Sequence, residues 1–207
     1  AANASAVQTL LDKNDIVVSD QLNHASIIDA VRVAGVKNKF AYKHSDMGEL
    51  ESTLQKAAEL QKTPKPNGEN PLILVVTDGV FSMDGDLAKL PNIVELCKKY
   101  DALSMVDDAH GEGVLGKGGR GVVDHFGLTG KVDIEIGSLS KAFSVMGGFI
   151  AARQPLIDWY LMKARQRLMS IALTIPDTAA LIEAVAMLSE SERLVGKLWG
   201  NVDYLRK

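Results

Sequence analysis

The sequence is short of three things: it has one cysteine, a net charge of only −3 and no long apolar run. The lone Cys97 cannot form an internal disulfide, and its place in the helical pattern NIVELCKKY indicates a buried structural thiol. So small a net charge gives no global field that would direct the chain to nucleic acid or to a membrane surface. No apolar run approaches the roughly 20 residues that a membrane-spanning helix needs. We therefore expect a soluble, cytoplasmic protein whose partners must be argued from local features.

The length and composition favour a packed core. The chain has 207 residues, 46% of them hydrophobic, which is enough for one large domain or for part of a larger protein. Apolar runs at Leu72–Thr77 and Ala102–Val106 are typical of strands buried in a parallel sheet, and a helix beginning at Pro91 separates them. Ile136 and the run Gly148–Ala151 are too close for a helical crossover, so that last strand is expected to be antiparallel. The pattern predicts a three-layer α/β fold with a mostly parallel sheet and helices on both faces.

Shorter signals predict the remaining elements. Gly35 is a natural left-handed stop for a helix that begins near Ser26. Asp46 and Glu49 form a capping box that opens a helix reaching Gln61. Further expected elements are a helix at Ala4–Leu11, strands at Ile16–Val18, Phe40–Tyr42 and Val132–Ile136, and helices from Pro155 onward, interrupted by Pro176, with a long periodic stretch at Ala179–Leu205.

Ionisable residues follow two of the predicted strands. Asp107 and His110 come after the strand that ends at Val106, and Lys141 follows the strand that ends at Ile136. In α/β sheets, ligands bind outside the carboxyl ends of the strands, so these side chains are expected to converge there. A partly desolvated lysine has a lowered pKa and can attack a carbonyl, whereas a buried aspartate needs a cation or hydrogen bonds. A solvated lysine is nevertheless the commoner fate of any one lysine.

Five motifs in order then give the chain a family likeness. They are DQLNHASIIDA, DGVFSMDGD, DDAHGEGVLGKGGRG, GSLSKAF and GGFIA. Together they resemble the α-oxoamine synthases, which are fold-type I enzymes dependent on pyridoxal 5′-phosphate. The resemblance covers essentially the whole chain. Within that family, the motifs are most similar to those of the glycine C-acetyltransferase branch, also called 2-amino-3-ketobutyrate CoA ligases. The second most similar branch is the 8-amino-7-oxononanoate synthases.

The resemblance implies roles for the residues that follow these two strands and for three others. Lys141 matches the lysine that forms the Schiff base with the cofactor. Asp107 matches the aspartate that keeps the pyridine nitrogen protonated, and His110 matches the histidine near the phenolic oxygen. Lys141 and His110 are thus the expected catalytic residues. Three further residues are expected to bind the cofactor: His24 on the ring face, Ser82 by a hydrogen bond, and Ser138 at the phosphate, where the family usually has threonine.

The implied reaction joins an amino acid to an acyl-CoA. The resemblance implies condensation of a small amino acid, with glycine expected, to give an α-amino-β-keto acid or its decarboxylated aminoketone. The alternative within the family is an 8-amino-7-oxononanoate synthase that uses alanine with pimeloyl-CoA or a pimeloyl carrier. A homodimer is also implied, and neither nucleic acid nor a membrane is expected as a partner.

The chain departs from the family pattern in several places. The family has an earlier glycine-rich phosphate loop and a later small domain, so the resemblance implies a chain that is incomplete at both ends. We expect residues 1–175 to form part of the cofactor-binding domain and residues 176–207 to lead toward the small domain. Ile171 stands where a family threonine reaches the phosphate across a dimer interface, and Thr174 is a weak substitute. A chain of these residues alone is expected to bind cofactor poorly.

Other readings remain open. The same fold could carry an aldolase or an aminotransferase reaction, or the chain could be a non-catalytic or truncated module used for assembly. The DDxH motif could ligate a metal ion, although further clustered ligands are lacking and no metal is expected. His44 and His125 are interpreted as ordinary surface or loop histidines, and Arg120 receives no role.

Overall fold

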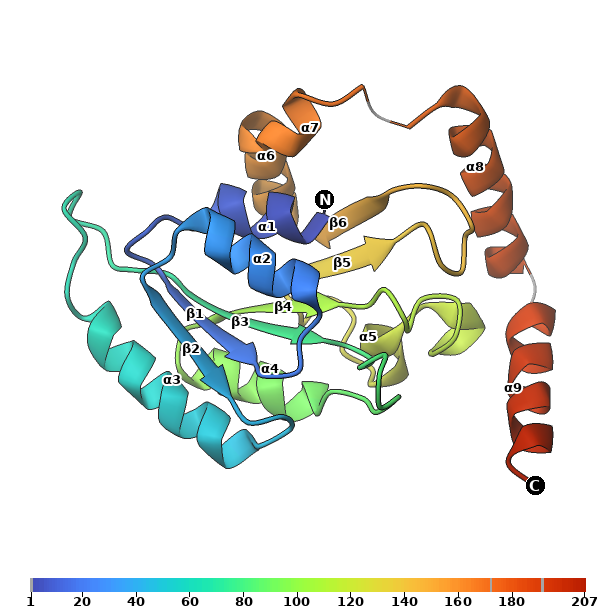
Figure 1. The fold of residues 1–207 in the computed structure, drawn as a ribbon, viewed down its shortest axis with the longest axis horizontal. Helices are drawn as coiled ribbons and strands as arrows, with labels where there is room; N and C mark the ends of the chain where they lie inside the picture. Colours follow the sequence, from blue (N-terminus) through green and yellow to red (C-terminus); the bar gives the residue numbers. More distant parts are fainter. Residues whose placement is uncertain (1, 172, 191) are drawn as a thin grey trace.

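The centre of the fold is one six-stranded sheet. The computed structural model describes residues 2–171, 173–190 and 192–207, and Figure 1 shows its arrangement. The strands lie in the order β2-β1-β3-β4-β5-β6; the first five are parallel, and β6 pairs with β5 in the antiparallel sense. Both the mostly parallel sheet and the antiparallel last strand are therefore confirmed. The strands are β1 (Ile16–Asp20), β2 (Asn38–Tyr42), β3 (Ile73–Asp78), β4 (Leu103–Asp107), β5 (Ile134–Ser138) and β6 (Gly148–Ala152).

Helices cover both faces of this sheet, which confirms the three-layer fold. Leu74 and Val76 of β3 pack in one core with the N-terminal helices α1 (Ala2–Leu10) and α2 (Ala25–Ala34). Ile73 and Val75 pack in a second core, on the other face, with α3 (Met47–Gln61) and α4 (Leu90–Lys99). Every residue of β3 is buried, as a strand between two helical layers requires. The helices are α1 (Ala2–Leu10), α2 (Ala25–Ala34), α3 (Met47–Gln61), α4 (Leu90–Lys99), α5 (Val122–His125), α6 (Gln154–Lys163), α7 (Arg165–Leu168), α8 (Ile175–Glu190) and α9 (Arg193–Leu205), with a 3₁₀ turn at Lys117–Gly119.

Capping residues end α2 and begin α3. Gly35 has φ 70° and closes α2 in the left-handed conformation, as predicted. Asp46 accepts a hydrogen bond from the Glu49 amide at 2.9 Å, so it caps α3. The capping box is not reciprocal, however, because the Glu49 carboxylate accepts from the Lys43 amide at 2.8 Å and not from Asp46. The predicted box is therefore half right.

One prediction about a boundary was wrong. The strand expected at Val132–Ile136 lies at Ile134–Ser138, so Ser138 belongs to β5 and not to the loop after it. The periodic stretch Ala179–Leu205 falls on α8 and α9. The helices are divided between α7 and α8, and Pro176 lies in the first turn of α8, where proline is tolerated. The indole of Trp199 on α9 donates to the Val114 carbonyl at 2.8 Å, which ties this helix to the glycine-rich loop after β4.

The remaining predictions concern Cys97 and the membrane. Cys97 is buried on α4, and burial raises the pKa of its thiol to about 12, so the prediction of a structural thiol is confirmed. Among the described residues, no helix is both long enough and apolar enough to cross a bilayer.

Candidate active site

A cleft of about 500 Å³ opens at the carboxyl ends of the strands. Its position follows from the sheet, because Asp107 of β4 lies beside Asp78 of β3 on one side and Ile136 of β5 on the other. Glycines at 137, 147 and 148 leave its wall open. All six residues that the sequence singled out line this cleft: His24, Ser82, Asp107, His110, Ser138 and Lys141.

Asp107 is the buried carboxylate of the cleft. It is 8% exposed, and its Oδ1 accepts a hydrogen bond from the Ala109 amide at 3.1 Å. Its Oδ2 accepts from the side-chain amide of Asn3 at 2.6 Å. The sequence predicted a cation or hydrogen bonds beside this carboxylate, and the structure shows a neutral donor, Asn3, which lies 104 residues from Asp107 in the chain. Sequence reasoning missed Asn3, because one asparagine in a helical stretch carries no signal of a distant contact.

Lys141 and His110 lie at the mouth of the cleft. Lys141 is exposed, and so is its neighbour Ala142, so the predicted desolvation of this lysine is wrong for the described chain. His110 has a lowered pKa, because burial disfavours its charged form and the Lys141 ammonium repels a second positive charge. The lowered pKa favours the neutral imidazole, which can accept or donate a proton beside the amine of Lys141.

Ser138 lies at the end of β5, and its surroundings hold a second carboxyl group that the sequence did not reveal. Its hydroxyl lies 3.0 Å from that of Ser140, while its backbone amide donates to Glu112 Oε2 at 3.2 Å. Burial and then the charge of Asp108 raise the pKa of Glu112 to about 8. A Cβ on Gly137 would collide with the Phe149 ring and with Glu112 Oε1, so glycine at this position lets both side chains pack against the strand.

His24 and Asp78 belong to a network at the start of α2. Asp78 Oδ2 accepts from the His24 amide at 2.8 Å, and the Asp78 amide donates to Asn23 Oδ1 at 2.8 Å. Burial, reinforced by the charge of Asp107, raises the pKa of Asp78 to about 7. The Ser26 amide donates to Nδ1 of His24 at 3.2 Å, so a neutral His24 carries its proton on Nε2. The sequence predicted His24 but not Asp78 or Asn23.

Ile171 and Thr174, the two residues considered for a phosphate contact across a dimer interface, do not line the cleft of their own chain. Ile171 is fully exposed between α7 and α8 and is not among the residues that line the cleft. Thr174 is not at the cleft either: its hydroxyl donates to Asp177 Oδ2 at 2.7 Å and accepts from the Asp177 amide, so it caps α8. Among the described residues, no group of three or more histidines, cysteines and acids is arranged to hold a metal ion.

Comparisons with known proteins show what the chain is similar to. Curated relatives include the 8-amino-7-oxononanoate synthases of Fervidobacterium nodosum, 56% identical over 99% of this chain, and Thermosipho melanesiensis, 52% identical over 100%. The chain spans about half the length of these relatives, 50% in each case.

Two solved structures show the same fold. Serine palmitoyltransferase from S. paucimobilis, solved with a bound PLP–myriocin aldimine, is 30% identical with a TM-score of 0.85 over 97% of this chain and 48% of its own. An 8-amino-7-oxononanoate synthase from Francisella tularensis, 24% identical with a TM-score of 0.74 over 98% of this chain and 55% of its own, agrees in fold. The model of the aminotransferase class I and II family matches residues 1–207. Because that match covers the whole sequence, the chain belongs to the aminotransferase class I and II family.

Proposed function

We propose that this chain forms the pyridoxal-phosphate-binding part of an acyltransferase of the α-oxoamine synthase type. The observation that carries the proposal is the convergence of a buried carboxylate, an imidazole and a lysine amine on one cleft, from the ends of β4 and β5. The relatives' names support the reaction type, since the curated ones are 8-amino-7-oxononanoate synthases and a solved neighbour is a serine palmitoyltransferase.

The residues of the cleft fit this cofactor. Asp107 is a buried carboxylate whose two oxygens each receive one hydrogen bond from the described residues, which leaves acceptor capacity for a protonated ring nitrogen. Ser138 and Ser140 offer hydroxyl groups at the end of β5, where a phosphate would be held. Lys141 supplies the amine for the aldehyde carbon. When bound, the cofactor supplies an electron sink for a carbanion at the amino acid's α carbon.

The chain's own residues then move and hold protons. Lys141, once its amine is free, is placed to accept the α proton of the amino acid, and its exposure leaves the side chain room to do so. His110, whose pKa is lowered by partial desolvation and by the charge of Lys141, can donate a hydrogen bond to the phenolic oxygen. His24 lines the cleft, and its Nδ1 accepts from the Ser26 amide at the start of α2, which fixes the orientation of its ring.

For the substrates, we propose alanine and a pimeloyl thioester. The names of the curated relatives favour this pair over glycine with a short acyl-CoA, which was the first expectation from the motifs. Glycine C-acetyltransferase chemistry is therefore the second candidate. Both reactions release the thiol of the acyl carrier, so the two are separated by the amino acid consumed.

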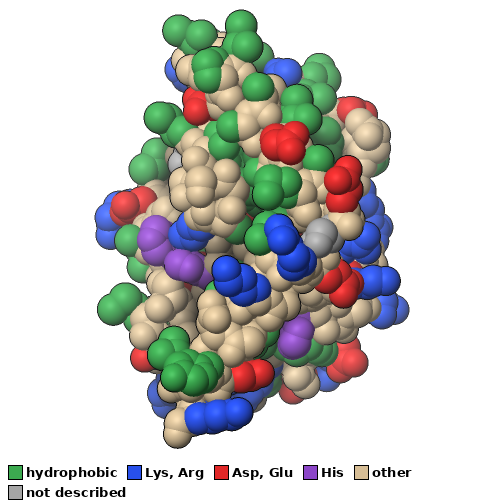
Figure 2. Space-filling model, turned by 90° about the vertical axis from the view of Figure 1, so that its right-hand side faces the viewer, with side chains coloured by type: hydrophobic (Ala, Val, Ile, Leu, Met, Phe, Trp, Pro, Cys, Tyr) green, Lys and Arg blue, Asp and Glu red, His purple; other side chains and the backbone are tan. Residues whose placement is uncertain are grey.

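We further propose a cytoplasmic homodimer in which residues 1–175 belong to the cofactor domain and 176–207 lead toward a small domain. Apolar side chains on and around α7 and α8 support an assembly, because a monomer rarely leaves so many exposed. Figure 2 shows apolar side chains along the upper part of the face that bears α8. The exposed ones include Met169, Ile171, Leu173, Ile175, Ile182 and Met187.

The test replaces the amine at the cleft. Lys141→Ala should abolish the visible absorbance of the protein with pyridoxal phosphate and the covalent label that borohydride fixes. Lys131→Ala, which alters an exposed lysine outside the cleft, should leave both unchanged. A chromophore and label that persist in Lys141→Ala would overturn the assignment. Incubating the wild-type protein with alanine or glycine and a panel of acyl thioesters, and measuring free thiol, identifies the substrates.

A further inference from the structure

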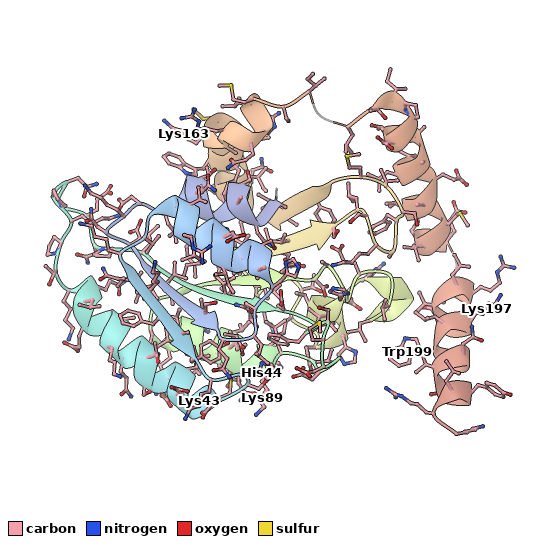
Figure 3. The ribbon with its side chains drawn as sticks, viewed as in Figure 1. Lys43, His44, Lys89, Lys163, Lys197 and Trp199 are labelled. Atoms are coloured by element: carbon pink, nitrogen blue, oxygen red, sulfur yellow. The ribbon has the colours of Figure 1, made fainter. Side chains whose placement is uncertain are left out.

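His44 is not an ordinary surface histidine, contrary to the interpretation of the sequence. Its imidazole lies between two carboxylates: Nδ1 is 3.0 Å from Asp20 Oδ1, and Nε2 is 2.7 Å from Asp86 Oδ2. The side chain is 19% exposed. Figure 3 shows His44 at the carboxyl edge of the sheet, with Lys43 and Lys89 labelled beside it.

The first carboxylate belongs to the loop that carries His24. Asp20 ends β1, and its side chain is 2% exposed. Besides His44, its Oδ1 accepts from the Leu22 amide at 2.9 Å, and its Oδ2 accepts from the Ser45 amide at 3.1 Å. Asp20 therefore fixes both the start of the segment leading to His24 and the loop in which His44 itself lies.

The second carboxylate belongs to the loop that carries Ser82. Residues 80–87 form a closed turn, because Val80 pairs with Leu87 and the Phe81 amide donates to the Asp86 carbonyl at 2.9 Å. Ser82 lies within this turn and lines the cleft. The Phe81 ring also packs edge-on against His44, with 4.4 Å between the ring centroids. His44 thus contacts the turn twice, once through a charge and once through an aromatic ring.

The geometry requires a doubly protonated ring. A carboxylate can only accept, and a neutral imidazole can donate from one nitrogen only, so both bonds form together only when His44 is an imidazolium. Burial opposes this charge, but the bonds to Asp20 and Asp86 and their negative charges outweigh burial and raise the pKa of His44. Lys89 faces the same loop but is engaged elsewhere, since its ammonium donates to the Ser45 carbonyl at 3.0 Å. Lys43 is the other cation of this loop.

We propose that His44 is a positioning residue, which as an imidazolium ties the Ser82 turn to the end of β1 and so holds the two loops that bear Ser82 and His24 at the cleft. This inference rests on the proposed function, because both loops are assigned to the cofactor. The pH dependence of this tie follows from the protonation of His44. The tie is complete below the ordinary histidine pKa of about 6.5 and loses one of its two bonds as the pH rises through the raised value.

The experiment compares two histidine variants in the full chain. His44→Asn removes the tie, and His125→Asn serves as control, because His125 is exposed on α5 and does not line the cleft. The dissociation constant for pyridoxal phosphate is measured by visible absorbance at pH 6 and pH 9. We expect His44→Asn to bind about tenfold more weakly than wild type at pH 6, the loss of one bond to a charged group, and less than threefold more weakly at pH 9. His125→Asn should match wild type at both values.

Other outcomes overturn the inference. A His44→Asn protein that binds like wild type at pH 6, or one weakened equally at both pH values, shows that His44 does not act through its charge. Should His44→Asn fail to fold, Asp86→Asn replaces it, because this variant keeps an acceptor oxygen but removes one charge. Its affinity for pyridoxal phosphate should decline at a lower pH than that of wild type. An unmoved decline refutes the tie. If wild type itself forms no borohydride-fixable adduct at Lys141, the proposed function fails, and the two failures remain distinct.

Discussion

Asn3 offers the sharpest test of how the cleft is held. Its side chain is 6% exposed on α1, and the single Nδ2 group donates to Asp107 Oδ2 at 2.6 Å and to Ser26 Oγ at 2.9 Å. Among the described residues its own Oδ1 has no partner, so an apolar replacement removes only the two bonds of Nδ2 and leaves Asp107 Oδ2 without this donor. Asn3→Leu is a replacement of similar size.

The magnitude follows from what Asp107 retains. Without Asn3, this buried carboxylate keeps one bond from the residues that the structure describes, the bond from the Ala109 amide. Losing a hydrogen bond to a buried charged group costs about 1.5–3 kcal/mol, whereas a neutral bond costs about 0.5–1.5 kcal/mol. We therefore expect Asn3→Leu, which loses one bond of each kind, to lower the free energy of unfolding by about 2–4.5 kcal/mol. Ser26→Ala, which keeps the bond between Asn3 and Asp107, should lower it by about 1 kcal/mol.

Two measurements check this reasoning. Urea unfolding followed by far-UV circular dichroism gives the free energies of wild type, Asn3→Leu and Ser26→Ala. Titration with pyridoxal phosphate should also show a loss of affinity of about tenfold for Asn3→Leu, because an unpinned carboxylate holds the ring less well and each factor of ten corresponds to about 1.4 kcal/mol. The reasoning is refuted if Asn3→Leu unfolds within about 0.5 kcal/mol of wild type, below even the weakest neutral bond of that range.

Two further predictions concern buried carboxyl groups. Burial raises the pKa of Glu112 to about 8, so between pH 4.5 and about 8 the folded chain retains a proton that the unfolded chain loses. Wild type should therefore lose stability relative to Glu112→Gln as the pH rises through this range. Urea-unfolding free energies that run parallel with pH in the two proteins would contradict this. Asp15 is 1% exposed and accepts from Lys65 and from two backbone amides, so Asp15→Ala should cost at least about 2 kcal/mol of unfolding free energy. Asp29→Ala, which breaks an exposed pair on α2, should cost less than about 0.5 kcal/mol, and equal losses in the two variants would contradict the argument from burial.

The fold could be predicted from the sequence largely because its signals are local. The apolar run of β3 is buried on both faces and can be read directly, and Gly35 marks the end of α2 without any tertiary information. The predicted end of a strand was wrong where polar residues extend it by pairing with a neighbouring strand. Ser138 looks like a loop residue, but pairing with Gly148 of β6 extends the strand to include it.

The candidate site was predictable to the extent that its residues follow strands. Asp107 and Lys141 come after apolar runs, so convergence at the sheet edge could be inferred before the structure was known. Asn3, Glu112 and His44 could not be found in this way, because each acts through a partner fixed only by the fold. Asn3 is 104 residues from Asp107 in the chain. His44 is 24 and 42 residues from its two carboxylates.

The bond between Trp199 and Val114 has a practical consequence. The chain has two tryptophans, and the other, Trp159 on α6, donates to the Thr9 carbonyl at 2.9 Å. One indole is therefore anchored to the loop that carries Glu112, and the other to the end of the helix that carries Asn3. With Trp159 replaced by phenylalanine, the emission of Trp199 alone would report on the glycine-rich loop, and the reciprocal variant would report on α1. The protein thus contains an intrinsic fluorophore at each of the two supports of its cleft.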